Sequence, residues 1–177
     1  MKYALPILLS STLMLSACAS TVPEVIRHAP VQEVSVEQAG AAPEVHQGKR
    51  VRWGGSIVTV ENHRDATWVE LLSRPLGSNQ KPNADQPAGS RFLARLNGFV
   101  DPAEFAPDRL LTVVGRLAGT REQLIGEYPY RYAVIEVQAH HLWPVPVEPR
   151  PRHSPAYPWY DPWYDPWYRP WPYRRYW

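Results

Sequence analysis

The sequence contains a single cysteine, Cys18, among its 177 residues. One cysteine excludes an internal disulfide and a metal site built from several thiolates. The formal net charge of +2 is close to balance, so the chain has no overall field that would favour nucleic acid as a partner. Long apolar runs are also scarce, because the run at residues 4–15 falls short of the ~20 residues that a membrane-spanning helix needs.

The amino terminus has the pattern of an export signal. Lys2 supplies a positive charge, residues 4–15 form the short apolar run, and Leu15-Ser16-Ala17 brings small residues to the position before Cys18. A charged start, an apolar stretch and small residues in this order are typical of a secretory signal peptide. Residues 1–17 are therefore predicted to be a signal peptide that is removed from the mature protein.

The segment Leu15-Ser16-Ala17-Cys18 resembles the lipobox of bacterial lipoproteins. In that class the cysteine thiol receives a diacylglyceryl group, the leader is cut just before it, and the new amino terminus is acylated. The resemblance implies that Cys18 is the lipidation site, that acyl chains such as palmitate anchor the chain in a membrane, and that no free thiol remains for catalysis. In lipoproteins of enteric type an Asp after the cysteine favours the inner membrane. Ala19 stands here, which implies the outer membrane.

Residues 18–47 are predicted to form a lipidated tether. They are rich in Val, Pro, Glu, Ala and Gln and show no sustained helical or alternating period. This composition favours a mostly extended linker. The valines at Val31, Val34 and Val36 leave open that part of the tether lies along the folded domain as an added edge strand.

Residues 48–144 are predicted to form an all-β domain. Five segments have the composition or the alternation of a strand: residues 49–60, 66–72, 91–96, 109–118 and 132–143. In the first segment the apolar phase changes beside Gly54-Gly55, which predicts a bulge or a sharp coil. In the fourth, Gly115 marks a close approach of a neighbouring chain. The last is predicted to place on one face Ala133, Ile135, Val137 and Ala139.

The connections complete the predicted architecture. Residues 73–90 are rich in Pro, Gly and Asn and predict a long loop, which is a candidate functional loop because of its length. Asp101 and Pro102 are suited to cap and begin a short helical turn between the third and fourth strands. This order matches a small five-stranded OB-fold-like barrel. A small open antiparallel sandwich remains the alternative, because periodicity does not distinguish the two.

Several segments between Cys18 and Trp143 together carry a family resemblance: Gly48 to Gly55, Arg91 to Ala94, Gly98 to Pro102, Thr112 to Gly115, and Gly126 to Tyr128 leading to Leu142-Trp143. Their joint order resembles the Slp family of outer membrane lipoproteins from Gram-negative bacteria, named after a starvation-inducible lipoprotein. The resemblance implies location and architecture, and its name implies a link to starvation or stress. It implies no catalytic residue and no defined ligand.

The chain ends in a tail rich in Pro, Trp and Tyr, residues 145–177, in which Pro-Trp-Tyr begins at Pro158, Pro162 and Pro166. Proline at every fourth position excludes a regular helix or a central strand, so the tail is predicted to be disordered. Its aromatic rings are suited to stacking on sugars or lying at a membrane interface. The candidate envelope-binding residues are Trp159, Tyr160, Trp163, Tyr164, Trp167, Tyr168, Arg174 and Arg175. The alternative is a low-complexity extension without a partner.

The sequence lacks recognisable catalytic motifs. The spacing of a zinc motif is missing from the six histidines, His28, His46, His63, His140, His141 and His153. The carboxylates lack a diagnostic glycosidase spacing, and serine hydrolase and phosphate-loop motifs are missing. The chain is predicted to be a non-enzyme with no metal and no cofactor. The adjacent His140 and His141 are expected on opposite faces of the last strand, one exposed and one packed near Trp143.

The predicted function is a structural or interaction role in the Gram-negative cell envelope. The expected partners are outer membrane lipid, through Cys18, and peptidoglycan, lipopolysaccharide or an envelope protein, whereas export argues against nucleic acid. Four arginines are candidates to bind anionic head groups or acidic glycans: Arg50, Arg52, Arg91 and Arg95. The alternative is that they form a solvated charged face. The alternative function is a periplasm-facing binding module for a glycan, peptide or small ligand, which needs a concave pocket.

Overall fold

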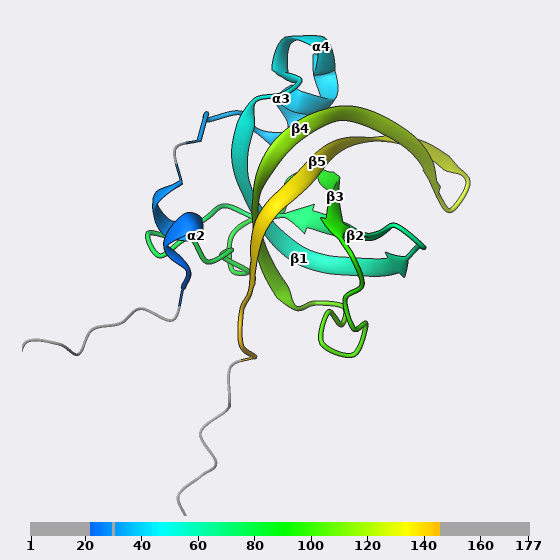
Figure 1. The fold of residues 1–177 in the computed structure, drawn as a ribbon. Helices are drawn as coiled ribbons and strands as arrows, with labels where there is room; N and C mark the ends of the chain where they lie inside the picture. The colour runs from blue at the N-terminus through cyan, green and yellow to red at the C-terminus, as the bar shows by residue number, and fades with distance from the viewer. Residues whose placement is uncertain (1–21, 30, 146–177) are drawn as a thin grey trace, which may run out of the picture. The chain divides into compact units, whose positions relative to one another are not determined.

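Five strands close into a barrel in the computed structural model, which describes residues 22–29 and 31–145 (Figure 1). The strands are β1 (Arg50–Asn62), β2 (Ala66–Ser73), β3 (Arg91–Asn97), β4 (Leu110–Ile125) and β5 (Tyr128–Leu142). Their order around the barrel is β1-β2-β3-β5-β4, and β4 pairs back with β1. Only the pairing of β3 with β5 is parallel. The predicted OB-fold-like barrel is confirmed, and the open sandwich is excluded.

Closure of the barrel depends on β1, which pairs with a different strand in each half. Gly55 lies where the halves meet and has Cα partners on both neighbours, Ser73 on β2 and Leu111 on β4. A Cβ atom at Gly55 would collide with the carbonyl oxygen of Leu72. Glycine is therefore required at this crossing because it lets the two backbones approach closely.

The predicted irregularity of the first strand lies further along the chain than Gly54-Gly55. The register of β1 against β2 shifts between Ile57 and Thr59, which leaves Val58 as the extra residue of a bulge. Ile57 is buried, and Val60 packs against the same interior cluster. The bulge explains the change of apolar phase, and the two glycines serve close packing.

A second bulge changes the faces of β5. Ala133, Ile135 and Val137 belong to the interior cluster, as predicted, but Ala139 packs outside it. The pairings change from Gly115 with Val137 to Val114 with Ala139, so Gln138 is the extra residue. The prediction that Ala139 shares the interior face is therefore wrong, because the inserted residue reverses the alternation.

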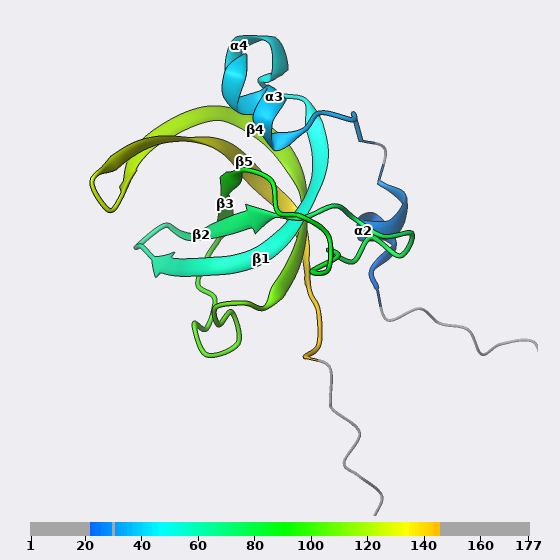
Figure 2. The same cartoon turned by 180° about the vertical axis from the view of Figure 1, so that it is seen from behind.

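Residues 22–47 are not the mostly extended tether predicted from the sequence. They contain three short helices, α2 (Glu24–His28), α3 (Val36–Ala41) and α4 (Pro43–His46). Figures 1 and 2 show α3 and α4 at one end of the barrel. Helices of four to six residues carry too few apolar positions to show a period, which explains the wrong prediction. Among the described residues, no helix is long and apolar enough to cross a membrane.

The barrel core holds this amino-terminal segment in place. Ser35 and Gln38 form a capping box in which each side chain accepts a hydrogen bond from the other's backbone N–H, and this begins α3. Trp53 donates from its indole nitrogen to the Val34 carbonyl at 2.8 Å. No strand forms over Val31, Val34 and Val36, and their side chains pack in apolar clusters instead. The segment is thus part of the folded domain.

The predicted helical turn between β3 and β4 is a single hydrogen-bonded turn. The Asp101 carbonyl accepts from the backbone N–H groups of Glu104 and Phe105, both at 3.0 Å. The Asp101 carboxylate accepts from the Ala103 N–H at 2.8 Å, which is the predicted capping role. Phe105 is buried in the barrel core, so the turn covers the end of the barrel opposite α3.

Close approach of β4 and β5 at Gly115 leads to a stability prediction. A Cβ atom there would collide with the Glu136 carbonyl oxygen. We expect Gly115→Ala to lower the free energy of unfolding by about 1–3 kcal/mol, because the two strands must separate. The control is Gly40→Ala in α3, where a Cβ meets nothing within 4 Å and alanine favours the helix. Urea denaturation measures both, and an equal loss would contradict the close approach.

Candidate functional site

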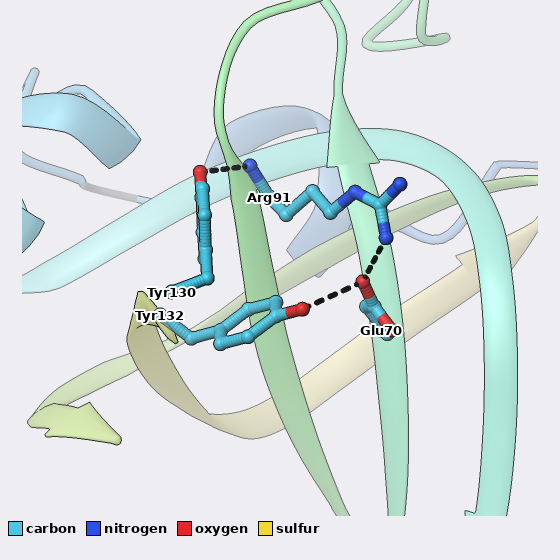
Figure 3. Close-up of polar contacts among 4 residues, drawn as sticks. All are labelled: Glu70, Arg91, Tyr130 and Tyr132. Carbon is cyan, nitrogen blue, oxygen red and sulfur yellow. Dashed lines mark hydrogen bonds and ion pairs between the residues drawn. The ribbon is translucent and has the colours of Figure 1, made fainter. Parts of the chain in front are cut away.

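A carboxylate joins three strands on the outer face of the barrel (Figure 3). Oε1 of Glu70 on β2 accepts from Arg91 Nη1 on β3 at 2.7 Å and from the Tyr132 hydroxyl on β5 at 2.9 Å. The Tyr130 hydroxyl accepts from the Arg91 backbone N–H at 3.0 Å. The Glu70 side chain is only 13% exposed, so these charge-assisted bonds form largely out of water.

The hydrogen bonds to Glu70 affect the protonation of Tyr132 and Arg91. Burial, and then the hydrogen bond and charge of Glu70, raise the pKa of Tyr132 to about 12. The hydrogen bond to Glu70 also raises the pKa of Arg91. Tyr132 therefore stays a neutral donor and Arg91 a cation. Both side chains therefore keep their hydrogen bonds to Glu70 near neutral pH, and the network is suited to hold three strands together.

The β4–β5 hairpin extends beyond the barrel as a two-stranded ribbon, residues 120–132 (Figure 1), and side chains of the ribbon pack against β2 and β3. Leu93 and Tyr132 are 3% and 2% exposed there, and Trp68 and Ile125 pack against them. The Arg121 guanidinium lies 4.8 Å from the centre of the Trp68 ring, a cation–π contact from β4 to β2. The ribbon is thus fixed to the barrel by aromatic and charged contacts.

A groove lies between α3 and the ribbon. Its volume is about 690 Å³, and the residues that give it chemical character are Glu37, Arg91, Glu122, Tyr128, Tyr130 and Arg131. Tyr128 is 69% exposed, so its ring is available to a ligand. The groove combines two carboxylates, two guanidinium groups and two phenols, and a mixture of planar rings and hydrogen-bonding groups of both signs suits a polar ligand such as a glycan.

Glu37 of α3 forms one wall of the groove. Its carboxylate accepts from the Ser90 backbone N–H at 2.7 Å. Desolvation opposes ionisation, but hydrogen bonds from the Ser90 and Glu37 backbone and from serine side chains outweigh it and lower the pKa of Glu37. The wall therefore carries a fixed negative charge near neutral pH.

The predicted long loop lies beside this groove. Together with Arg52, Trp53 and Glu37, its residues line a second hollow of about 370 Å³. The loop folds back on itself. Leu76 and Pro82 form an isolated antiparallel β-bridge, and Arg74 donates to the Gln86 carbonyl at 2.7 Å. The prediction of a long loop is confirmed.

The sequence-predicted site residues do not gather in one place. Cys18 and all eight candidate envelope-binding residues of the tail lie outside the described residues. Three of the four candidate arginines are engaged within the protein: Arg52 donates to the Ala29 carbonyl, Arg91 to Glu70 and Arg95 to Glu136. The four arginines therefore do not form the single charged face that the sequence predicts. The sequence could have indicated the Glu70 network only through the polar residues Glu70 and Arg91, which lie on the outward faces of β2 and β3.

The adjacent histidines lie as the alternation predicts. His141 packs edge-on against Trp143 with ring centres 4.6 Å apart, and His140 keeps exposed surface while its ring meets Phe105 at 5.7 Å. Desolvation lowers the pKa of both, and the charge of His141 lowers that of His140 further. In the part of the chain that the structure describes, no group of three or more His, Cys, Asp or Glu side chains could hold a metal ion.

The Glu70 network yields a second stability prediction. We expect Glu70→Ala to lower the free energy of unfolding by about 1–3 kcal/mol, because it leaves the buried Tyr132 hydroxyl and the Arg91 guanidinium without their acceptor. The matched control is Glu122→Ala, which removes an ion pair with Arg131 whose side chains are 68% and 58% exposed, and its effect should stay within about 0.5 kcal/mol. Chemical denaturation separates the two, and equal effects would rule out a stabilising role for the network.

Comparison with known proteins extends these observations. The model of the outer membrane lipoprotein Slp family matches residues 15–176, which includes Cys18 and continues through the tail past the end of the resemblance seen at Trp143. Among solved structures, a small single-stranded DNA-binding protein from Streptomyces coelicolor is 15% identical with a TM-score of 0.35, covering 54% of this chain and 94% of that one.

Two relatives come from Escherichia coli (strain K12). The uncharacterized lipoprotein YeaY is 34% identical over 149 residues, which cover 84% of this chain and 76% of the relative. The outer membrane protein Slp is 29% identical over 139 residues, which cover 77% of this chain and 73% of the relative. These matches confirm the resemblance carried by the sequence segments, and the chain belongs to the outer membrane lipoprotein Slp family.

Proposed function

We propose that the protein is a lipid-anchored, non-catalytic interaction protein of the outer membrane, held there through Cys18. The observation that carries the proposal is the position of Val22 and Ile26. Both are buried against Val114 and Trp143 of the barrel, and Val22 comes four residues after Cys18. Four residues span at most about 14 Å, so a lipid on Cys18 keeps the barrel at the membrane surface.

This short link limits how far the barrel can lie from its lipid anchor. Had residues 18–47 been the extended tether predicted from the sequence, the barrel could have stood about 100 Å from its anchor. Packing of α2 and α3 on the barrel removes nearly all of that length. The protein is therefore suited to partners at or close to the membrane. A link to starvation or stress stays a prediction that rests on the family name.

Lipidation is tested by replacing the cysteine. We expect Cys18→Ala to abolish incorporation of radiolabelled palmitate and to move the protein out of the membrane fraction, because no thiol remains to accept the lipid. The control variant Ser20→Ala should label and fractionate as the unaltered protein does. Membrane association of Cys18→Ala equal to that of the control would overturn the proposed anchor.

A second candidate function is binding of an envelope glycan in the groove between α3 and the ribbon. The exposed Tyr128 ring beside Arg131 and Glu122 favours it, because carbohydrate sites combine a stacking face with charged hydrogen-bonding groups. None of the groove residues belongs to the cluster that packs α2, so the groove stays open when the α2 side faces a membrane.

Sedimentation with purified peptidoglycan tests the groove. We expect Tyr128→Ala in the unlipidated chain, residues 19–177, to reduce co-sedimentation several-fold, because the variant lacks the exposed ring on which a sugar would stack. The matched control is Phe99→Ala, which removes a ring that is 74% exposed outside the groove. A chain that ends at Val145 separates a contribution of the tail. Equal retention of both aromatic variants would assign binding, if any, to another surface.

A further inference from the structure

The two ends of the described chain leave the barrel at one place. Val22, the first described residue, and Ile26 of α2 pack in one cluster with Trp143, which lies two residues before the last described residue, Val145. Figure 1 shows α2 and the end of β5 away from α3 and the ribbon. Val22 and Trp143, which lie at or near the two described ends of the chain, are therefore close together in the fold.

Four basic side chains surround this place, and we name them the exit rim: Arg27, Arg52, Lys81 and Arg109. Each forms a hydrogen bond or a cation–π contact with a residue near one of the two described ends of the chain. Arg27 donates to the Val22 carbonyl at 3.2 Å, and Arg52 to the Ala29 carbonyl at 2.9 Å. Arg109 donates to the Trp143 carbonyl at 2.9 Å, and the Lys81 ammonium lies 5.9 Å from the centre of a Trp143 ring.

The exit rim carries positive charge that the described residues leave uncompensated. None of its four members forms an ion pair with a described carboxylate, whereas Arg91, Arg95 and Arg131 elsewhere on the barrel each do. Burial and then the nearby charge of Arg50 lower the pKa of Arg52. Acidic residues close in the chain or in contact with the exit rim are Glu24 on α2, Asp108 next to Arg109, and Glu104, whose backbone carbonyl accepts from Arg109 at 3.0 Å.

Apolar side chains are exposed at the same place. Val25 of α2 is 46% exposed, and Val145 is 58% exposed. A surface that combines exposed apolar groups with half-buried cations that have no carboxylate partner fits the boundary between head groups and acyl chains of an anionic membrane. Each Lys or Arg near such a surface strengthens association about fivefold.

We propose that the exit rim is the surface on which the barrel docks on the membrane, with its basic side chains contacting the phosphates of anionic phospholipids. The proposal rests on the proposed anchor, because the link of four residues from Cys18 to Val22 brings this face to the bilayer. Docking through the exit rim also turns the groove between α3 and the ribbon away from the membrane.

Vesicle binding by the unlipidated chain, residues 19–177, tests the docking surface separately from the anchor. Vesicles of phosphatidylcholine alone are compared with vesicles that also contain phosphatidylglycerol. We expect binding only to the anionic vesicles and loss of binding as salt is raised, because salt screens exposed charges. Equal binding to both vesicle types, or none to either at low salt, would overturn the proposal even if palmitate labelling confirms Cys18.

The variants locate the surface. Arg27→Gln with Lys81→Gln should weaken binding about twenty-five-fold, whereas Arg64→Gln with Arg131→Gln, which removes the same charge from the β1–β2 loop and the ribbon, should have little effect. Arg27→Lys with Lys81→Arg retains the charge and should retain binding even if the bond to Val22 is lost. Melting temperatures establish that each variant is folded. Equal losses in the two neutralised pairs would show that binding follows net charge and not the exit rim.

Discussion

The pairing of β1 with both β2 and β4 is the constraint on which the rest of the structure depends. Without it, β1 would be the edge of an open sheet with unpaired backbone groups. Closure creates the barrel end that receives Val36 and Ala39 of α3, and it places Trp53 where its indole can bind the Val34 carbonyl. The ribbon is the continuation of β4 and β5 past this closed section. The groove and the position of α2 thus both follow from the way β1 is shared.

The regular strands could be predicted from the sequence because their side chains alternate. Residues 91–96 are a clear case, and β3 covers Arg91–Asn97. The predictions failed where a single residue breaks the alternation, as Gln138 does, since an inserted residue is visible only when the partner strand is known. They failed again over α3, whose stability comes from a capping box and from burial against the barrel and not from a long apolar period.

The candidate sites divide in the same way. The signal around Cys18 is local, because the four residues that end at Cys18 and the charged and apolar leader before them suffice to predict it. The Glu70 network is not local, because Glu70 and Tyr132 are 62 residues apart in the chain and meet only through the strand order. The groove and the exit rim needed α2 and α3, which the sequence did not predict. A site formed by tertiary contacts becomes predictable only once those contacts are known.

The strand order also affects when the protein can fold. The first half of β1 has no partner strand until β4 has been made. β3 pairs with β2 on one side, but its other side has no partner until β5, the last strand of the barrel, has been made. Folds dominated by such distant pairings have a high contact order and form slowly. A chain with a signal peptide has to be threaded across a membrane before it folds. The strand order that closes the barrel therefore also delays its formation, which suits a chain that is predicted from its sequence to be exported before it folds.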